Sequence, residues 1–208
     1  MIVAGVDGCR TGWAVALADA SSILDIRVFP AFADVVALGC DAIAVDMPIG
    51  LLDHGPRACD VEARRRLRPR RSSVFPTPLR PMLATTTYAE ASAIAGLSKQ
   101  AFHLLPKIRE VDAVAHDPRI VEVHPELSLA ALGGAGPLPS KKTAAGRAAR
   151  VALLTGWLGD LGELPSGDDG LDALAVAWSA QRWLAGRASA LPGVPAYDEI
   201  GRPMRIVT

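Results

Sequence analysis

The first fifty residues restrict the fold most, because strand-like and helical segments alternate there in short succession. Residues 2–7 and 12–18 are Val-rich apolar runs separated by a short turn segment, which is typical of two strands joined by a tight turn. Residues 22–29 partly alternate and predict a third strand. Residues 31–39 have helical spacing and end at a glycine, and residues 42–46 form a continuous apolar strand. Since a helix between strands usually crosses over to a parallel neighbour, the order predicts a mixed α/β sheet flanked by helices.

The chain changes character between residues 51 and 117, which are rich in Arg and Pro. The part from Tyr88 to His116 predicts short helices interrupted by Gly96 and Pro106. We interpret the whole segment as a mainly helical insertion that projects from the sheet between the fourth and fifth strands. The strand pattern resumes at residues 119–123.

Three helices are predicted after the fifth strand. Pro125 suits the first turn of one helix, and Ser140 is a candidate cap for the next. Asp168 or Asp169 is a candidate cap for the last helix, whose apolar residues recur at helical spacing. We expect residues 1–208 to form one domain.

Composition excludes several classes of protein. The 208 residues are 50% hydrophobic, and 22 basic residues balance 22 acidic ones, so the chain is neither disordered nor collagen-like. A protein that coats nucleic acid with its whole surface would be basic overall, so any such role requires a local patch. The apolar runs are shorter than the roughly 20 residues that span a bilayer, and the N-terminus lacks the basic start of a secretory signal. We therefore expect a cytoplasmic protein.

Four acidic residues stand in apolar surroundings, where a charge is expensive to bury. They are Asp7, Asp46, Glu122 and Asp172. If the first, fourth and fifth strands are neighbours, these carboxylates converge at one edge of the sheet, where oxygen ligands suit Mg²⁺ or Mn²⁺. Two such ions roughly 3.5–4 Å apart would support hydrolysis of phosphodiester bonds. Asp7 and Asp46 have the alternative of organising turns, and Asp169, on the same helical face as Asp172, is either a further ligand or a cap.

A second signal is basic. Eight arginines and only two acidic residues fall between positions 57 and 80. Arginine suits bidentate contacts with phosphate, although a solvated helix face with internal ion pairs would have the same composition. Lys141 and Lys142 stand at a predicted helix start, against the usual dipole preference for acids there. The candidate substrate-binding residues are Arg57, Arg64, Arg65, Arg70, Arg71, Ser72, Ser73, Lys141 and Lys142.

His124 lies two residues after Glu122 and is followed by Pro125 and Glu126. It is a candidate general acid–base beside the metal ions, with a capping role as the equal alternative. Glu126 is a reserve metal ligand.

Many separate blocks of the sequence together resemble one family. The blocks are GVDGCRTGWAVA, DMPIGL, GPRACDVEARR, RRSSVFPTP, KIREVD, EVHPELS, SKKTAAGR and DDGLDALAVAW. They are similar to a bacterial family of unknown function usually described as predicted RNase H-like nucleases. The resemblance implies a ribonuclease H-like mixed sheet and acidic metal ligands at Asp7, Asp46, Glu122 and Asp172. The long insertion has no counterpart that we can map in the better-understood nucleases, so the choice of substrate stays open.

The resulting hypothesis is a nuclease that uses two Mg²⁺ or Mn²⁺ ions on RNA, DNA or a small nucleotide. One alternative is a non-catalytic protein that binds nucleic acid or a nucleotide with the same fold. A lesser alternative follows from GVDGCRTGW, which resembles the phosphate-binding opening of actin-like ATPases and sugar kinases. Those proteins place a nucleotide between two such domains, and this chain has one copy.

Overall fold

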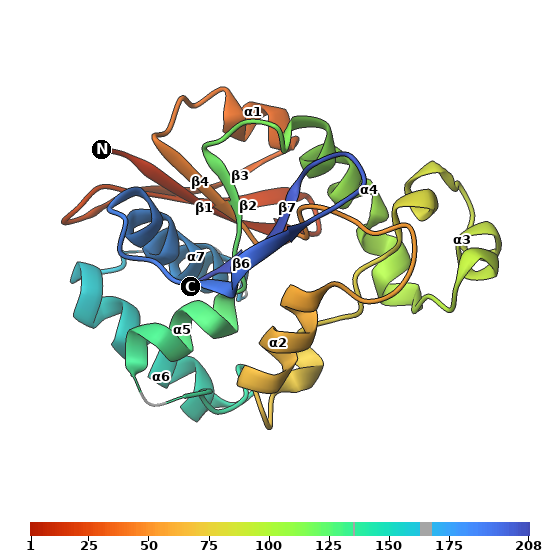
Figure 1. The fold of residues 1–208 in the computed structure, drawn as a ribbon. Helices are drawn as coiled ribbons and strands as arrows, with labels where there is room; N and C mark the ends of the chain where they lie inside the picture. Colours follow the sequence, from red (N-terminus) through yellow and green to blue (C-terminus); the bar gives the residue numbers. More distant parts are fainter. Residues whose placement is uncertain (135, 163–167) are drawn as a thin grey trace.

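The centre of the computed structural model, which describes residues 1–134, 136–162 and 168–208, is a five-stranded mixed sheet (Figure 1). The first three strands form an antiparallel meander, and the fourth and fifth run parallel to the first. The order across the sheet is β3-β2-β1-β4-β5, so the predicted mixed sheet is confirmed. The strands are β1 (Val3–Cys9), β2 (Gly12–Ala18), β3 (Ile23–Phe29), β4 (Ala42–Val45) and β5 (Ile120–Glu122).

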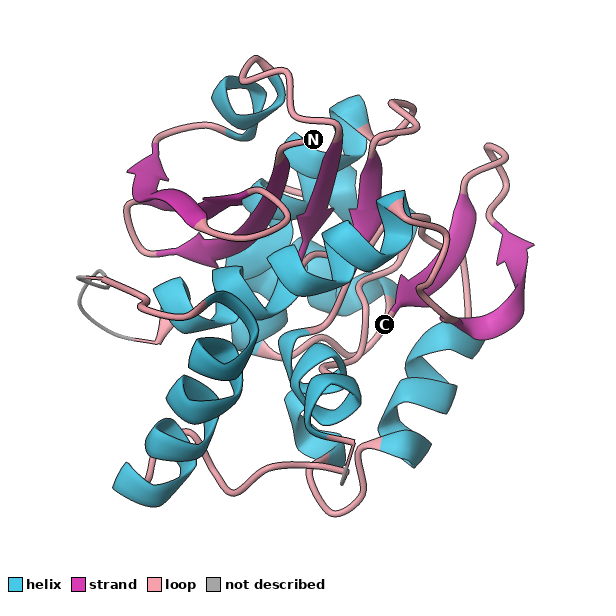
Figure 2. Ribbon diagram, turned by 90° about the vertical axis from the view of Figure 1, so that its left-hand side faces the viewer, coloured by secondary structure: helices cyan, strands magenta, loops and turns pink. Residues whose placement is uncertain are grey.

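Helices cover both faces of this sheet (Figure 2). On the face that we call the α7 face, α7 packs on the strands with support from α5 and α6, and on the opposite face α1 and α4 do so. Alternation along each strand feeds both cores, because Val3 of β1 packs on the α7 face while Ala4 and Val6 pack on the other. The helices are α1 (Phe32–Val36), α2 (Ala58–Arg66), α3 (Tyr88–Ile94), α4 (Lys99–Val114), α5 (Pro125–Gly133), α6 (Ala144–Leu158) and α7 (Asp169–Leu184).

The segment between β4 and β5 is helical, as predicted, but only part of it projects from the sheet. It holds α2, two 3₁₀ turns (η1, Arg71–Ser73; η2, Arg80–Ala84), α3 and α4. Figure 1 shows α3 lying well to the side of the strands, whereas α4 packs on the sheet through Ile108 and Val111. The helix also continues through Pro106, where an interruption was predicted, because this proline is exposed on the outer side of α4.

A C-terminal hairpin was not predicted. It consists of β6 (Ala190–Tyr197) and β7 (Pro203–Val207), and a parallel bridge joins Val207 to Val123 just beyond β5. Pro192 and Pro195 lie within β6 and hide its strand character, since proline cannot donate to a ladder.

None of the helices among the described residues has the length and apolar character needed to cross a membrane.

The helix α7 packs very closely on β1 at Gly5. A Cβ atom on Gly5 would lie 2.0 Å from the carbonyl oxygen of Ala173 and 2.3 Å from the backbone nitrogen of Ala177. Only a hydrogen atom fits between strand and helix here. The first turn of α7 therefore lies directly beside the carboxyl end of β1.

We predict that Gly5→Ala destabilises the protein severely, because its new methyl group would meet rigid backbone atoms. Overpacking costs about 1–3 kcal/mol where side chains can yield, and we expect a loss at or above the top of that range. The loss is measured as a lower urea midpoint. Gly156→Ala, on α6 with open space around its new methyl group, is the control and should stabilise by about 0.5–1 kcal/mol. Equal midpoints for Gly5→Ala and wild type would contradict the close packing.

Candidate functional site

Three carboxylates come together at the carboxyl ends of the central strands. Asp7 lies near the end of β1, Asp46 directly follows β4, and Asp172 lies in the first turn of α7. β1 and β4 are parallel, and the backbone N–H of Asp46 donates to the carbonyl of Val6 at 2.9 Å, so the two strand ends lie side by side. The packing of α7 at Gly5 adds Asp172 from above the sheet.

Strand alternation directs these side chains to one face. Asp7 follows Val3 and Gly5 at steps of two along β1 and shares their α7 face. Asp46 follows Ala42 and Ala44 in the same way along β4. The carboxylates of Asp7 and Asp46 therefore face the same helix.

The three carboxylates line a pocket of about 510 Å³, which we call the acidic pocket. The segments around it come from the ends of β1 and β4, from the insertion, from the start of α5 and from the loop before α6. Besides Asp7, Asp46 and Asp172, its lining includes Met47, Arg70, Ser72, Ser73, Phe75, Gln100, Leu104, His124, Glu126, Lys141 and Lys142.

Mutual repulsion and burial make ionisation of this cluster costly. The pKa values of Asp7 and Asp46 are raised well above their ordinary range, first by desolvation and then by the neighbouring carboxylates. Neither of these two side chains has an ion-pair or hydrogen-bond partner among the residues that the structure describes. Burial also raises the pKa of Asp172, although Lys141 opposes that rise.

Lys141 is the cation nearest to the cluster. Its Nζ atom lies 2.5 Å from Oδ2 of Asp172, and although burial disfavours the charged ammonium, this ion pair raises its pKa. Lys141 and the exposed Lys142 belong to the loop before α6, because Thr143 caps that helix by accepting from the backbone N–H of Gly146. The prediction that Ser140 caps the helix is therefore wrong.

Glu126, the reserve ligand, is a fourth carboxylate of the pocket. It is 6% exposed, and its Oε1 accepts from Arg150 at 2.6 Å and from Arg70 at 3.1 Å. Its Oε2 is buried and has no hydrogen-bond partner within the described part of the chain. Arg150, which is 1% exposed, was not predicted as a site residue; the only signal was an arginine on the apolar side of a helix.

Glu122 does not line the acidic pocket, and the predicted convergence is corrected at this residue, although its charge is near enough to raise the pKa of Asp46. Val121 of β5 and Val123 just beyond it pack on the α7 face, so Glu122 between them points the other way. Its two carboxylate oxygens each lie 2.7 Å from a guanidinium nitrogen of Arg57, and one also accepts from the backbone N–H of Ile49. A side chain held in this way has little capacity left to bind a metal ion.

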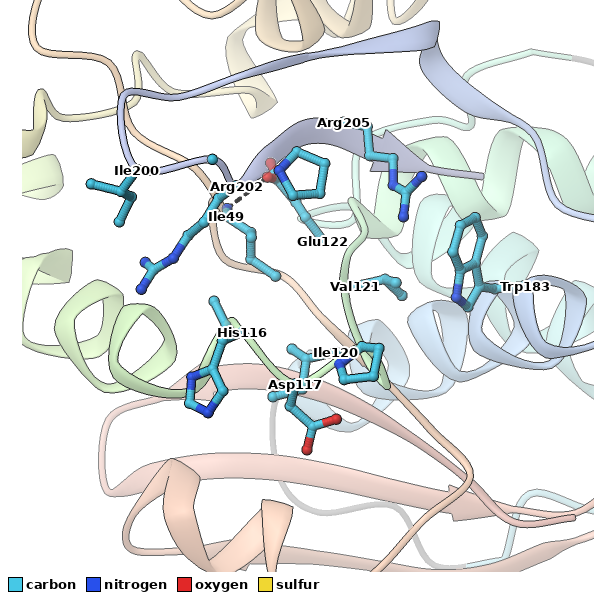
Figure 3. A pocket seen from close by; sticks show the side chains of 14 residues that line it. Ile49, His116, Asp117, Ile120, Val121, Glu122, Trp183, Ile200, Arg202 and Arg205 are labelled. Atoms are coloured by element: carbon cyan, nitrogen blue, oxygen red, sulfur yellow. Dashed lines mark hydrogen bonds between the residues drawn. The ribbon is translucent and has the colours of Figure 1, made fainter.

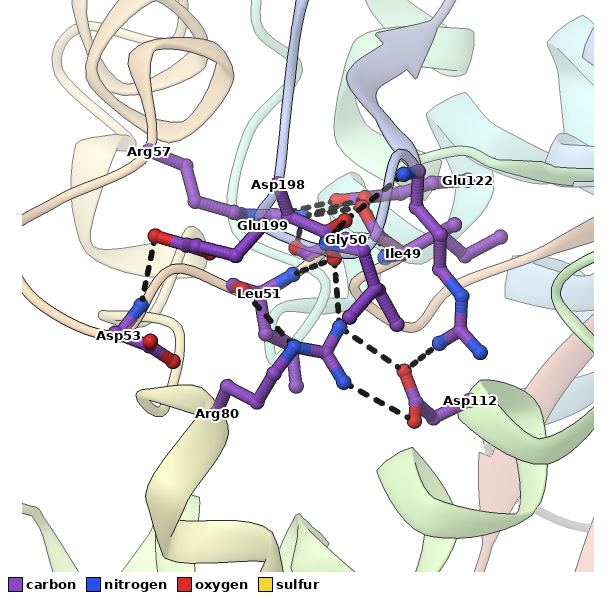
Figure 4. A network of polar contacts seen from close by, with 12 residues as sticks. Ile49, Gly50, Leu51, Asp53, Arg57, Arg80, Asp112, Glu122, Asp198 and Glu199 are labelled. Atoms are coloured by element: carbon purple, nitrogen blue, oxygen red, sulfur yellow. Dashed lines mark hydrogen bonds and ion pairs between the residues drawn. The ribbon is translucent and has the colours of Figure 1, made fainter.

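Arg57 is correspondingly unavailable to a substrate, contrary to prediction. It is 2% exposed, pairs with both Glu122 and Asp60, and donates to the carbonyl of Ile49 (Figure 4). Figure 4 also shows Arg80 held by carboxylates of Asp112 and Asp198. Both arginines therefore form ion pairs within the protein.

The remaining predicted phosphate-binding residues divide into two groups. Arg64 and Arg65 lie on α2 and Arg71 on η1, and none of the three lines the acidic pocket. Arg70 does line it but is committed to Glu126 and to the carbonyl of Leu138. The pocket brings together Arg70, Ser72, Ser73, Lys141 and Lys142.

His124 adopts the capping alternative. Its Nδ1 accepts from the backbone N–H of Glu126 at the start of α5, so Nε2 carries the proton and donates to the carbonyl of Ser73 at 3.2 Å. Burial lowers the pKa of this imidazole. With both nitrogens committed, His124 is not free to act as a general acid–base, which corrects that part of the prediction.

The two acidic residues at the start of α7 lie outside the pocket lining. Asp168 occupies the predicted cap position, but its carboxylate pairs with Arg147 at 3.1 Å and does not cap. The charge of Asp169 contributes to the raised pKa of Asp7. Asp169 is thus close enough to act on the cluster electrostatically.

A larger hollow of about 650 Å³ lies between β5, the end of α4 and β7 (Figure 3). Its two carboxylates are already neutralised, since Arg119 pairs with Asp117 and Arg57 pairs with Glu122. Arg205 lies over the ring of Trp183 at 4.4 Å. Because its acids are paired, we place the candidate site in the smaller acidic pocket.

The donor set of the acidic pocket fits a hard divalent cation. Its carboxylates are the ligand type that Mg²⁺ and Mn²⁺ prefer, and the unpartnered oxygen of Glu126 is a buried acceptor that still lacks a donor or a cation. Among the described residues, no group of three His, Cys, Asp or Glu side chains already has the closed arrangement of a metal site. The side chains would therefore have to adjust around an ion.

Comparison with known proteins gives a family and two likenesses. No curated protein matches the chain. The Thermus thermophilus RuvC structure is 17% identical, covers 90% of this chain and 98% of its own, and has a TM-score of 0.44. T. thermophilus RuvC in complex with a Holliday junction substrate is also 17% identical, with 90% and 97% covered and a TM-score of 0.48. Residues 5–197 match the family model described as "Protein of unknown function (DUF429)", and the chain belongs to that family.

Proposed function

We propose that the protein is a metal-dependent nuclease that hydrolyses phosphodiester bonds in the acidic pocket. Asp7, Asp46 and Asp172 would hold Mg²⁺ or Mn²⁺, with Glu126 beside them and Asp169 acting at longer range. The observation that carries this proposal is the pair Asp7 and Asp46, two adjacent carboxylates whose side chains have no hydrogen-bond or ion-pair partner among the described residues. A cation at this position would relieve their repulsion.

The surrounding residues suit a phosphate-containing substrate. When bound, divalent ions of this kind polarise phosphoryl oxygens and make bound water more acidic. Lys142 and Ser72 are exposed in the pocket lining and would bind phosphate oxygens there. Arg70 and Arg150 hold Glu126 in place through ion pairs with one of its carboxylate oxygens.

One observation favours a second candidate, a protein that binds nucleic acid or nucleotides without cleaving them. Lys141 already neutralises Asp172 in the structure, so part of the cluster is balanced without any metal ion. If that pair persisted in solution, Lys142 and Ser72 would bind phosphate without a metal ion. Metal binding separates the two candidates.

We predict that Mn²⁺ raises the melting temperature of the wild type. At about one hundred times its Kd, an ion stabilises by about 2.7 kcal/mol, which for a chain of this length corresponds to about 5–10 °C. Asp46→Asn should largely abolish the rise, while Asp53→Asn, at an exposed loop residue, should leave it unchanged. A rise of equal size in Asp46→Asn would place the ion elsewhere.

The stability of the metal-free protein should depend on pH with a definite sign. Because the pKa values of Asp7 and Asp46 are raised on folding, the folded state binds more protons than the unfolded state above about pH 4. Stability should therefore fall as pH rises from there through the raised pKa values. Asp46→Asn should flatten this fall in urea-unfolding midpoints, and wild-type midpoints that rise steadily over the same range would contradict the repulsion.

We predict that Asp172→Asn lowers the rate of nucleic-acid cleavage in Mn²⁺ by at least about 100-fold. Losing residues that merely orient metal ligands costs about 10–100-fold, and Asp172 is assigned as a ligand itself. Asp168→Asn, at the helix cap outside the pocket lining, is the control and should cleave like wild type. The assay uses single-stranded, duplex, hybrid and branched substrates. Full activity of Asp172→Asn would remove it from the ligand set.

A further inference from the structure

We infer that the acidic pocket accepts one nucleotide unit with an unpaired base, and that Phe75 is the surface on which this base stacks. The inference rests on the proposed function and specifies its substrate class. Two sources share this chemistry, namely a free nucleotide and the end of a single strand. The interior of a duplex does not.

The walls of the pocket limit the size of what enters. Ser72, Ser73 and Phe75 come from the segment after α2, Gln100 and Leu104 from α4, and the two lysines from the loop before α6. Segments far apart in the sequence thus surround the carboxylates. A volume of about 510 Å³ lies within the range of sites that enclose one small organic ligand.

The lining holds an apolar part beside its charged part. Met47, Phe75 and Leu104 line the same pocket as the carboxylates, and Phe75 is the only Phe, Tyr or Trp side chain in its described lining. Phe75 also packs on the small apolar cluster of Met82 and Leu105, which holds its ring in place, yet it stays partly exposed. A fixed, partly exposed ring next to a phosphate-binding region suits stacking by a nucleobase.

Uncommitted polar groups complete this arrangement. The side chains of Gln100 and Lys142 are exposed in the lining, and neither has a partner among the described residues. The amide of Gln100 both donates and accepts, as recognition of a base edge requires, while Lys142 suits a phosphate. One nucleotide would use all three groups: the Phe75 ring and the Gln100 amide for its base, and the Lys142 ammonium for its phosphate.

Few cations in or near the acidic pocket are free to follow a longer backbone. Arg57 and Arg80 are bound to internal carboxylates, and Arg70 is bound to Glu126. Arg64 and Arg65 lie away from the acidic pocket. Since affinity for long nucleic acids grows with the number of phosphates neutralised, this pocket favours a short unit over a duplex track.

The binding test measures a nucleoside 5′-monophosphate by calorimetry, without added metal and again with Mn²⁺. Phe75→Ala should weaken binding by about 5- to 100-fold, the range reported for removing one stacking partner. Phe75→Leu, which keeps the apolar packing, should weaken it similarly, and Phe75→Trp should retain it. The matched control is Phe102→Ala, because Phe102 packs on the same apolar cluster but does not line the pocket. Equal affinity in wild type, Phe75→Ala and Phe75→Leu would overturn the inference even if no substrate is cut.

The activity test compares two synthetic phosphodiesters and four nucleic acids in Mn²⁺. Phe75→Ala should raise the KM for thymidine 5′-p-nitrophenyl phosphate by about 5- to 100-fold. It should not change the KM for methyl p-nitrophenyl phosphate, which has the same leaving group but no nucleoside. Cleavage of linear but not circular single strands would support the strand end, and cleavage of the thymidine ester alone would support the free nucleotide.

Two outcomes separate the inference from the proposed function on which it rests. If circular and linear duplexes are cut as fast as linear single strands, the nuclease stands and the single-unit pocket is wrong. If Mn²⁺ neither binds nor supports cleavage of any substrate, the proposed nuclease fails, and the calorimetry alone decides whether Phe75 binds a base. The Mn²⁺-induced rise in melting temperature should be the same in Phe75→Leu and wild type.

Discussion

The contact of α7 with β1 at Gly5 determines where the charges of this protein meet. A strand and a helix that approach until only a hydrogen atom fits between them fix the helix along its own axis as well as across the sheet. Asp172 lies one residue before Ala173, whose carbonyl forms this contact, so its carboxylate is placed beside the end of β1 with little freedom. The parallel pairing of β1 with β4 then supplies Asp7 and Asp46 at the same edge. One close packing contact and one strand pairing are sufficient to assemble the cluster.

That cluster is expensive for the folded protein, and the structure offsets only part of the expense. Lys141 neutralises Asp172, and Arg70 and Arg150 share one oxygen of Glu126. Asp7 and Asp46 form no ion pair of their own with the described residues; the charge of Lys141 lowers their pKa values only in part, and burial and repulsion still leave them raised. Under the proposed function, a cation from outside would relieve the remaining repulsion, and the cluster would lower stability when that cation is absent.

Features that depend on local sequence patterns could be predicted from the sequence, whereas features that depend on contacts between distant residues could not. Strand periodicity and the neighbouring strand ends predict the meeting of Asp7 and Asp46, while the apolar setting of Asp172 on the last helix and the family resemblance add the third carboxylate. Glu122 was misplaced because a short apolar strand does not reveal which face each residue takes, and a shift of one residue reverses the face. The role of Arg57 could not be predicted, since only the tertiary fold brings its guanidinium to Glu122, which lies 65 residues away in the sequence. The strand β6 was not predicted because its prolines disfavour a strand locally. Its extended structure depends on pairing with β7, which local sequence patterns do not reveal.

Glu122 and His124, which do not have the catalytic roles predicted for them, both hold one wall of the acidic pocket in place. Glu122 holds Arg57 at the start of α2, and His124 donates to the carbonyl of Ser73 beyond the end of that helix. Both ends of the α2 segment are therefore fastened to β5 and the residues that follow it. This segment carries Phe75, two residues after Ser73, so its wall of the acidic pocket is held in place by the strand next to the carboxylates. Because an unpaired buried charge is costly, loss of either partner in the Arg57–Glu122 pair would free this wall while leaving Asp7, Asp46 and Asp172 on their own elements. The carboxylate cluster and this wall of the pocket thus depend on different residues, and under the proposed function a change in the insertion would alter the choice of substrate without altering Asp7, Asp46 or Asp172.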